Sequence, residues 1–152
     1  MQSQVGESAR SLLDAAQGAP LRALALEQAE WFADRARLLE VLVSVAEGRQ
    51  SVAQASPMLS RHDPTEMSGV IYGWLSRCLN QAYSGQQSAD PSLAPLLSRL
   101  SRAVPPARLL RAAQRVLEGR RALMSGANPN KDLLYEQWLL VLVGVDAAAA
   151  AL

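Results

Sequence analysis

The stretch that decides the fold is DPTEMSGVIYGWLSRCLNQA, residues 63–82. Asp63 precedes Pro64, so a carboxylate can cap the first turn of a helix while proline occupies the first helical position, where a missing N–H costs nothing. Glu66, three residues after the cap, approximates a capping box. The apolar residues that follow are alternately three residues and one residue apart, which is helical periodicity. This pattern predicts a helix over 64–83 with a buried face made of Met67, Ile71, Trp74, Leu75 and Cys78.

The rest of the chain has the same helical character. The same pair of a capping residue and a proline occurs at Asp90-Pro91 and at Asn128-Pro129, and we expect a helix to start at each. No segment shows the alternation of apolar and polar residues that a strand would need. The fold class predicted is therefore all-α, a bundle of about seven helices. Besides 64–83, the expected helices span 7–17, 20–47 (divided if the chain breaks near 27–30), 50–59, 91–101, 105–124 and 128–143.

Composition supports this fold class and excludes several others. The 152 residues include 25 Leu and 26 Ala but only three Trp, three Tyr and one Phe, a mixture that favours helices and excludes an all-β fold. The net charge of +1 points to no nucleic-acid or membrane partner. The longest apolar run near the end, 137–145, is too short for a bilayer helix of about 20 residues. The first residues lack the apolar stretch of a signal peptide, so we expect a cytoplasmic location.

No residue pattern points to catalysis. Cys78, the single cysteine, lies on the apolar stripe and is interpreted as a small core residue rather than a reactive thiolate. His62 and Asp63 could form a base with its orienting carboxylate, but Asp63 already has a capping role. The sole lysine, Lys131, lies in no glycine-rich phosphate loop. We therefore predict no catalytic, cofactor-binding or metal-binding residue and no cofactor.

The C-terminal half is mildly basic. Residues 1–76 carry six basic and nine acidic side chains, whereas residues 77–152 carry nine and five. Arg108, Arg111 and Arg115 share one side of the expected helix 105–124, opposite its apolar residues. This stripe is either a contact for phosphate or an acidic partner, or the solvated face of an amphipathic helix. The second interpretation is favoured, because no aromatic residue alternates with the arginines as single-strand binders require.

The last expected helix, 128–143, has two apolar arcs where a surface helix needs only one. The sequence leaves two placements open: the central helix of the bundle, or a helix with one arc docked on another protein. The first arc consists of Leu134, Trp138, Val141 and Val145, and the second of Tyr135, Leu139, Leu142 and Val143.

Two segments carry a resemblance to a known family. Residues 121–140, RALMSGANPNKDLLYEQWLL, lead from an arginine-rich helix through a Gly-Asn link into a helix of the Leu-Leu-x-Glu-x-Leu-Leu type. Residues 18–24, GAPLRAL, form a Gly-x-Pro-x-x-Ala-Leu turn. In their order along the chain, the turn first and the helix-link-helix segment second, they resemble the delta-prime subunit of the bacterial DNA polymerase III clamp loader. The turn lies in the lid domain of that family. From the start of the first motif to the end of the second, residues 18–140, the resemblance spans most of the chain.

The resemblance implies the end of an AAA+ lid domain at 1–27 and a helical collar domain at 28–145. The tail, 146–152, is of low complexity because it is rich in alanine, and we expect it to fray. The resemblance also implies a fragment without the nucleotide-binding head. In such loaders the subunits join through their C-terminal domains into a ring that loads the sliding clamp, and delta-prime is a rigid stator that does not hydrolyse ATP. Leu21, where ATPase subunits have a sensing arginine, agrees with that role.

The function expected from the resemblance is non-catalytic assembly of the clamp loader during DNA replication. The implied partners are the gamma/tau and delta subunits, bound through collar domains, with no membrane contact and no strong DNA binding. The alternative is a free-standing helical adaptor unrelated to replication, and a small enzyme using His62, Asp63 and Cys78 is the least favoured class. The subunit interface predicted from both lines of reasoning consists of Leu134, Trp138, Val141, Arg108, Arg111 and Arg115.

Overall fold

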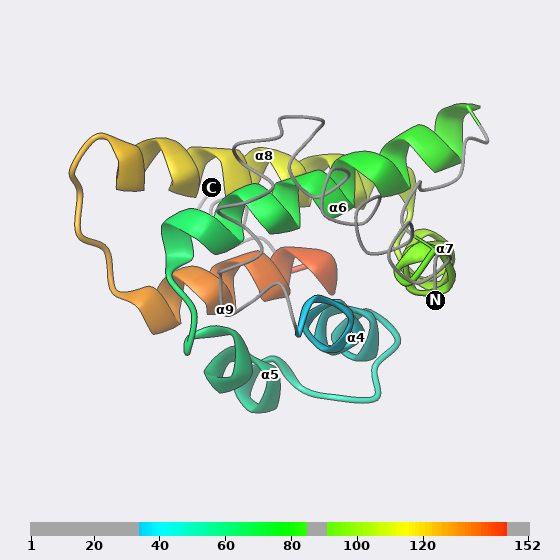
Figure 1. The fold of residues 1–152 in the computed structure, drawn as a ribbon, viewed down its shortest axis with the longest axis horizontal. Helices are drawn as coiled ribbons and strands as arrows, with labels where there is room; N and C mark the ends of the chain where they lie inside the picture. The colour runs from blue at the N-terminus through cyan, green and yellow to red at the C-terminus, as the bar shows by residue number, and fades with distance from the viewer. Residues whose placement is uncertain (1–33, 85–90, 146–152) are drawn as a thin grey trace, which may run out of the picture.

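A computed structural model describes residues 34–84 and 91–145, and all regular structure in this part of the chain is helical (Figure 1). This confirms the all-α fold class. The expected helix at 7–17 and the part of 20–47 before residue 34 lie outside the described residues. The helices are α4 (Arg35–Ala46), α5 (Val52–Leu59), α6 (Pro64–Ser84), α7 (Ala94–Ala103), α8 (Pro106–Met124) and α9 (Lys131–Leu142).

Helix α6 forms as its sequence predicts. The Oδ2 atom of Asp63 accepts a hydrogen bond of 3.1 Å from the backbone N–H of Glu66, so the expected cap is present. Helix α5 has the fuller version of this device, because the Ser51 and Gln54 side chains each accept from the other's backbone N–H. The predicted apolar face of α6 is buried at every position, namely Met67, Ile71, Trp74, Leu75 and Cys78.

Two predicted helix starts are wrong by three residues. Helix α7 begins at Ala94 rather than at 91, because Pro95 occupies its first turn and buried Leu93 accepts the N–H of Leu97. Helix α9 begins at Lys131 rather than at 128. Its cap is Asn130, whose side chain accepts the N–H of Leu133 at 3.1 Å. In both places the helix begins after the residue whose carbonyl accepts the first helical N–H, Leu93 for α7 and Asn130 for α9, rather than at the earlier proline.

The helices are arranged around α9. In Figure 1, α6 and α8 lie side by side and run in opposite directions, α9 lies below them, and α4 and α5 lie below α9. Helix α7 is seen end-on beside α4, and it also contacts α6. Helix α9 contacts α8, α5 and α4, so it has neighbours on opposite sides.

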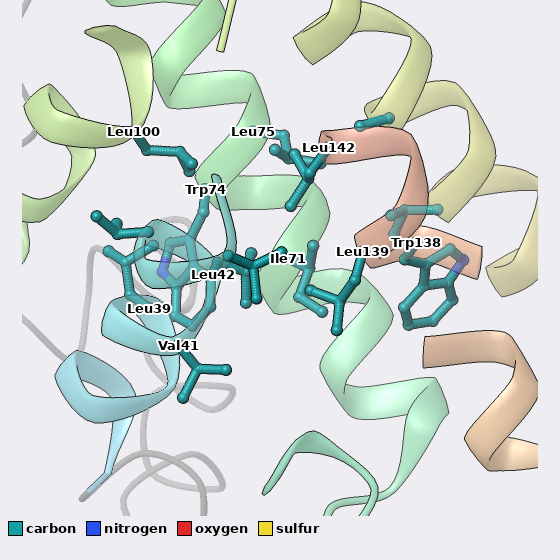
Figure 2. Packing of buried hydrophobic residues seen from close by; sticks show 14 of the residues in the cluster. Leu39, Val41, Leu42, Ile71, Trp74, Leu75, Leu100, Trp138, Leu139 and Leu142 are labelled. Atoms are coloured by element: carbon teal, nitrogen blue, oxygen red, sulfur yellow. The ribbon is translucent and has the colours of Figure 1, made fainter. Parts of the chain in front are cut away.

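The core is one continuous cluster to which all six described helices contribute. Figure 2 shows Trp74 of α6 beside Leu39 and Leu42 of α4, with Trp138 of α9 at the other end of the row of side chains. Trp74 is buried, and its indole ring lies between α6 and these leucines of α4. The two tryptophans therefore stabilise different helix contacts within the same core.

Candidate subunit interface

Helix α9 carries half of the predicted interface, and the members of both apolar arcs that lie within the helix are covered by the rest of this chain. Leu134, Trp138 and Val141 of the first arc are only 8%, 3% and 3% exposed. Of the two placements left open by the sequence, this burial favours the central helix of the bundle. The second arc is buried equally well, at Tyr135, Leu139 and Leu142.

Trp138 closes the contact between α8 and α9. A Cβ atom added at Gly119 of α8 would lie 2.9 Å from Cζ2 of Trp138, so only glycine lets the ring approach this closely. Tyr135 meets the same ring edge-on, with centroids 5.3 Å apart and planes at 86°. The Nε1 atom of Trp138 is buried and has no hydrogen-bond partner in the part of the chain that the structure describes. The indole thus acts as apolar surface between two helices.

Tyr135 ties α9 to the connection between α5 and α6. Its hydroxyl donates a hydrogen bond of 3.0 Å to the backbone carbonyl oxygen of His62, which lies 73 positions earlier in the chain. Burial raises the pKa of this hydroxyl above its ordinary value of 10.0, and the negative charges of Asp63 and Glu66 raise it further. The phenol therefore stays protonated and remains a hydrogen-bond donor.

The C-terminal end of α9 is where apolar side chains remain outside. Val143 is 38% exposed and Val145 is 49% exposed, although both belong to the predicted arcs. Between them Gly144 adopts a φ of +92°, and a Cβ atom there would lie 3.2 Å from Cζ of Arg108. The Arg108 guanidinium thus covers the end of α9, where a positive charge interacts favourably with the helix dipole.

The predicted basic stripe lies along the same edge of the bundle. Arg108 is half-buried against Gly144, Arg111 is exposed, and Arg115 forms an ion pair of 3.2 Å with Glu118. The structure therefore brings Arg108 of α8, with Arg111 one turn further along, to the segment after α9 that holds the two exposed valines. We call this surface the α8–α9 edge and define it as Arg108, Arg111, Val143 and Val145.

The structure separates the predicted interface residues into two groups. The three arginines belong to the outer surface, whereas Leu134, Trp138 and Val141 face the interior of their own chain. A partner would reach these three side chains only by displacing the helices that cover them. Their contact with another subunit stays a prediction. The exposed large apolar residues of this segment are Leu133 in α9 and, beyond its end, Val143 and Val145.

The residues weighed for catalysis are not brought together. Asp63 caps α6, and Cys78 lies 15 positions further along the same helix, about 22 Å away at 1.5 Å per residue. The Cys78 thiol donates to the backbone oxygen of Leu97 at 3.6 Å, and burial raises its pKa to about 11. In residues 34–84 and 91–145, no group of three or more histidine, cysteine or acidic side chains could hold a metal ion. No helix of that same part is long and apolar enough to cross a membrane.

A network of four charges went undetected in the sequence. Arg99 of α7 forms ion pairs with Glu47 at 2.7 Å and with Glu40 at 3.3 Å, and Arg49 pairs with the same two carboxylates at 2.8 and 3.0 Å. Hydrogen bonding from Arg99, followed by that from Arg49, lowers the pKa of Glu47 despite some desolvation. Glu40, Glu47 and Arg49 lie close together in the sequence, so their ion pairs are local. The pairing of both carboxylates with Arg99 depends on the fold.

The comparison with protein families identifies the kind of domain. Residues 29–143, well over half of the chain, match the family described as DNA polymerase III, delta subunit, C terminal. The chain belongs to this family. The match confirms the expected membership of the clamp loader, but it names the delta subunit and does not specifically support delta-prime. Neither the curated proteins nor the solved structures contained a match.

Membership gives the domain a general role. The polymerase III delta C-terminal family is an accessory, non-catalytic part of the holoenzyme, and its partners are other clamp-loader subunits. The domain described here is therefore a clamp-loader component of the replication machinery. Contacts with other subunits must use its outer surface, because the interior of the bundle is already filled by its own side chains.

Proposed function

We propose that this domain is the collar of a delta-prime-type subunit, the stator of the clamp loader, and that it acts in the bacterial cytoplasm. Residues 28–145 form the collar and residues 1–27 the end of a lid domain. The observation that carries the proposal is the family match over 29–143. The motifs at 18–24 and 121–140 favour delta-prime over delta, and Leu21 at the position of the sensing arginine favours a subunit that does not hydrolyse ATP.

The packing of α9 suits a static role. Its apolar residues are engaged by neighbours on opposite sides, and Tyr135 anchors it to the connection before α6. Closely packed interiors resist deformation, so a helix held in this way keeps its neighbours in fixed positions. A stator needs this property, since it holds the other subunits while they move.

We further propose that the α8–α9 edge is the surface that joins a neighbouring subunit, gamma/tau or delta. Val143 and Val145 supply apolar area, and Arg108 and Arg111 supply charge beside it. Apolar area contributes to affinity, while charges at the rim of an interface act mainly on association rate and salt dependence. The edge thus combines the two features of a subunit contact in one place.

Reconstitution of the loader with one subunit omitted tests the subunit assignment. This chain is mixed with gamma/tau and delta, and separately with gamma/tau and delta-prime, and complexes are separated by size-exclusion chromatography. A delta-prime-type chain completes the complex only in the first mixture. Assembly only in the second mixture would make it a delta-type subunit, and absence of assembly in both would favour the free-standing adaptor.

A matched pair of variants tests the α8–α9 edge. Changing both valines, Val143→Gln and Val145→Gln, removes exposed apolar area without adding charge, and should weaken assembly about tenfold. The control is Leu133→Gln at the opposite end of the same helix, where the side chain is 56% exposed. Assembly is measured by pull-down of the partner subunits. If the control variant weakens this pull-down as much as the valine variant does, the edge is not the subunit contact.

A further inference from the structure

A second surface feature lies on a different side of α4 from the charge network. Residues of α4, α5 and the connection before α6 enclose a cavity of about 240 Å³. Its floor is apolar and consists of Leu38 and Val41, which are buried, and Met58, which is half-buried. An apolar floor inside a concave site can take up an apolar side chain of a ligand.

The rim of this cavity is positively charged. Arg37 and Arg61 line it together with His62, and Asp34 is the one carboxylate among the described lining residues. Within the described chain neither Arg37 nor Arg61 forms an ion pair, whereas Arg49 and Arg99 each pair with two carboxylates. The two guanidinium groups at the cavity therefore keep their hydrogen-bonding capacity for a ligand.

We propose that this cavity binds an acidic peptide segment of a protein partner, in which a carboxylate lies next to an apolar side chain. The carboxylate forms charge-assisted hydrogen bonds with Arg37 and Arg61, and the apolar side chain rests on the floor. The site goes beyond the clamp-loader role proposed above and does not depend on it, because it lies on α4 and α5 rather than on the α8–α9 edge.

A nucleic-acid strand fits the site less well than a peptide does. A strand carries a negative charge at every phosphate, and Asp34 on the rim would repel the second of two neighbouring charges. No Trp, Tyr or Phe is among the described residues lining the cavity, so a base has no ring on which to stack. A peptide with an isolated carboxylate next to a Leu side chain suits the site better, because the carboxylate can pair with the arginines while the Leu side chain rests on the apolar floor.

Fluorescence anisotropy with a labelled peptide tests the proposal on the full chain. The probe is Gly-Ser-Asp-Leu-Ser-Gly, and its controls replace the Asp by Asn or the Leu by Ser. We expect saturable binding of the probe, with at least about tenfold weaker binding of each control peptide. Arg37→Glu and Arg61→Glu should each weaken binding of the probe by about the same factor.

Arg121→Glu is the matched protein control, because it reverses one exposed arginine on α8, away from the cavity. It should leave binding of the probe within about twofold of the unchanged chain, since one distant surface charge is screened by salt. Thermal melts verify that all three variants fold. Absence of saturable binding, an equal loss with Arg121→Glu, or displacement of the probe by an oligo-dT strand at a lower concentration than by unlabelled peptide would each overturn the proposal.

Discussion

Two regions that join helices in this domain do so in opposite ways. At the α8–α9 junction, the buried Trp138 ring lies directly against Gly119. At the α4–α7 rim, which we define as Glu40, Glu47, Arg49 and Arg99, the helices are joined by exposed charges whose side chains are 28–51% exposed. The α8–α9 junction excludes water, whereas the charged groups of the α4–α7 rim remain in contact with water.

The difference teaches where stability resides. Removing atoms from a buried contact forfeits their transfer free energy and leaves a cavity. Removing one member of an exposed ion pair loses little, because water replaces the partner and salt already screens the charges. The free energy of unfolding should therefore depend strongly on the buried junction and only weakly on the charged rim. The following variants test that ranking.

The largest loss is expected at the indole ring. Trp138→Ala should lower the free energy of unfolding by about 3–5 kcal/mol, because a ring between α8 and α9 leaves a cavity that the helices cannot close. Urea unfolding followed by circular dichroism measures this loss. Trp74→Ala, at the contact between α4 and α6, should cost a similar amount. Unchanged unfolding curves would contradict the packing described for both rings.

A smaller loss is expected from one added methyl group. Gly119→Ala places a Cβ atom 2.9 Å from Trp138 Cζ2, and overpacking of this kind costs about 1–3 kcal/mol. Better helix propensity returns about 1 kcal/mol of that amount. Gly73→Ala in α6 is the control, since nothing lies within 4 Å of its added Cβ and the propensity gain should stand alone. Stabilisation by both variants would mean that α8 and α9 are not in close contact.

A still smaller and salt-dependent effect is expected at the rim. Arg99→Gln removes both ion pairs between α7 and the carboxylates of α4, yet these groups lie at the surface. The melting temperature should fall by less than with Gly119→Ala, and the difference should vanish at about 1 M salt, where the Debye length is about 3 Å. A loss that persists in high salt would show that the rim acts by packing rather than by charge.

The smallest expected effect is a dependence on pH through Glu47. Because the fold lowers the pKa of this carboxyl below its ordinary value of 4.5, its stabilising contribution is fully present above pH 4.5. The contribution is lost as the pH falls through the lowered pKa and the carboxyl is protonated. Acid unfolding of Glu47→Gln should show a shallower decline of stability in this range. An identical pH profile would assign the decline to other carboxyls.

The contrast between α6 and α9 explains what could be predicted. Helix α6 has one apolar stripe, so its periodicity indicated both the helix and the buried face, and the prediction for Trp74 and Cys78 is confirmed. Helix α9 has apolar residues on two sides, so periodicity indicated a helix but not which neighbours would cover it. Only its position between α8 and the α4–α5 layer puts Trp138 inside this chain.

The candidate site follows the same division. The arginines of the basic stripe were located from a helical wheel, because spacing within one helix is set by local geometry. The approach of Arg108 to Gly144, between Val143 and Val145, was not predicted, since it depends on how α8 meets the end of α9. The cavity beside Arg37 and Arg61 was missed for the same reason, because its lining comes from three separate segments.

The amino-acid sequence was sufficient to predict that the chain is helical, that α6 starts at Pro64 and that the family is that of the clamp loader. Caps, prolines and apolar spacing suffice for the first two, because helix formation involves hydrogen bonds between residues four positions apart. The tertiary structure decided which surfaces remain outside. It joins Arg99 to Glu40 across 59 positions and Tyr135 to His62 across 73, and contacts at such separations exist only once the helices have packed.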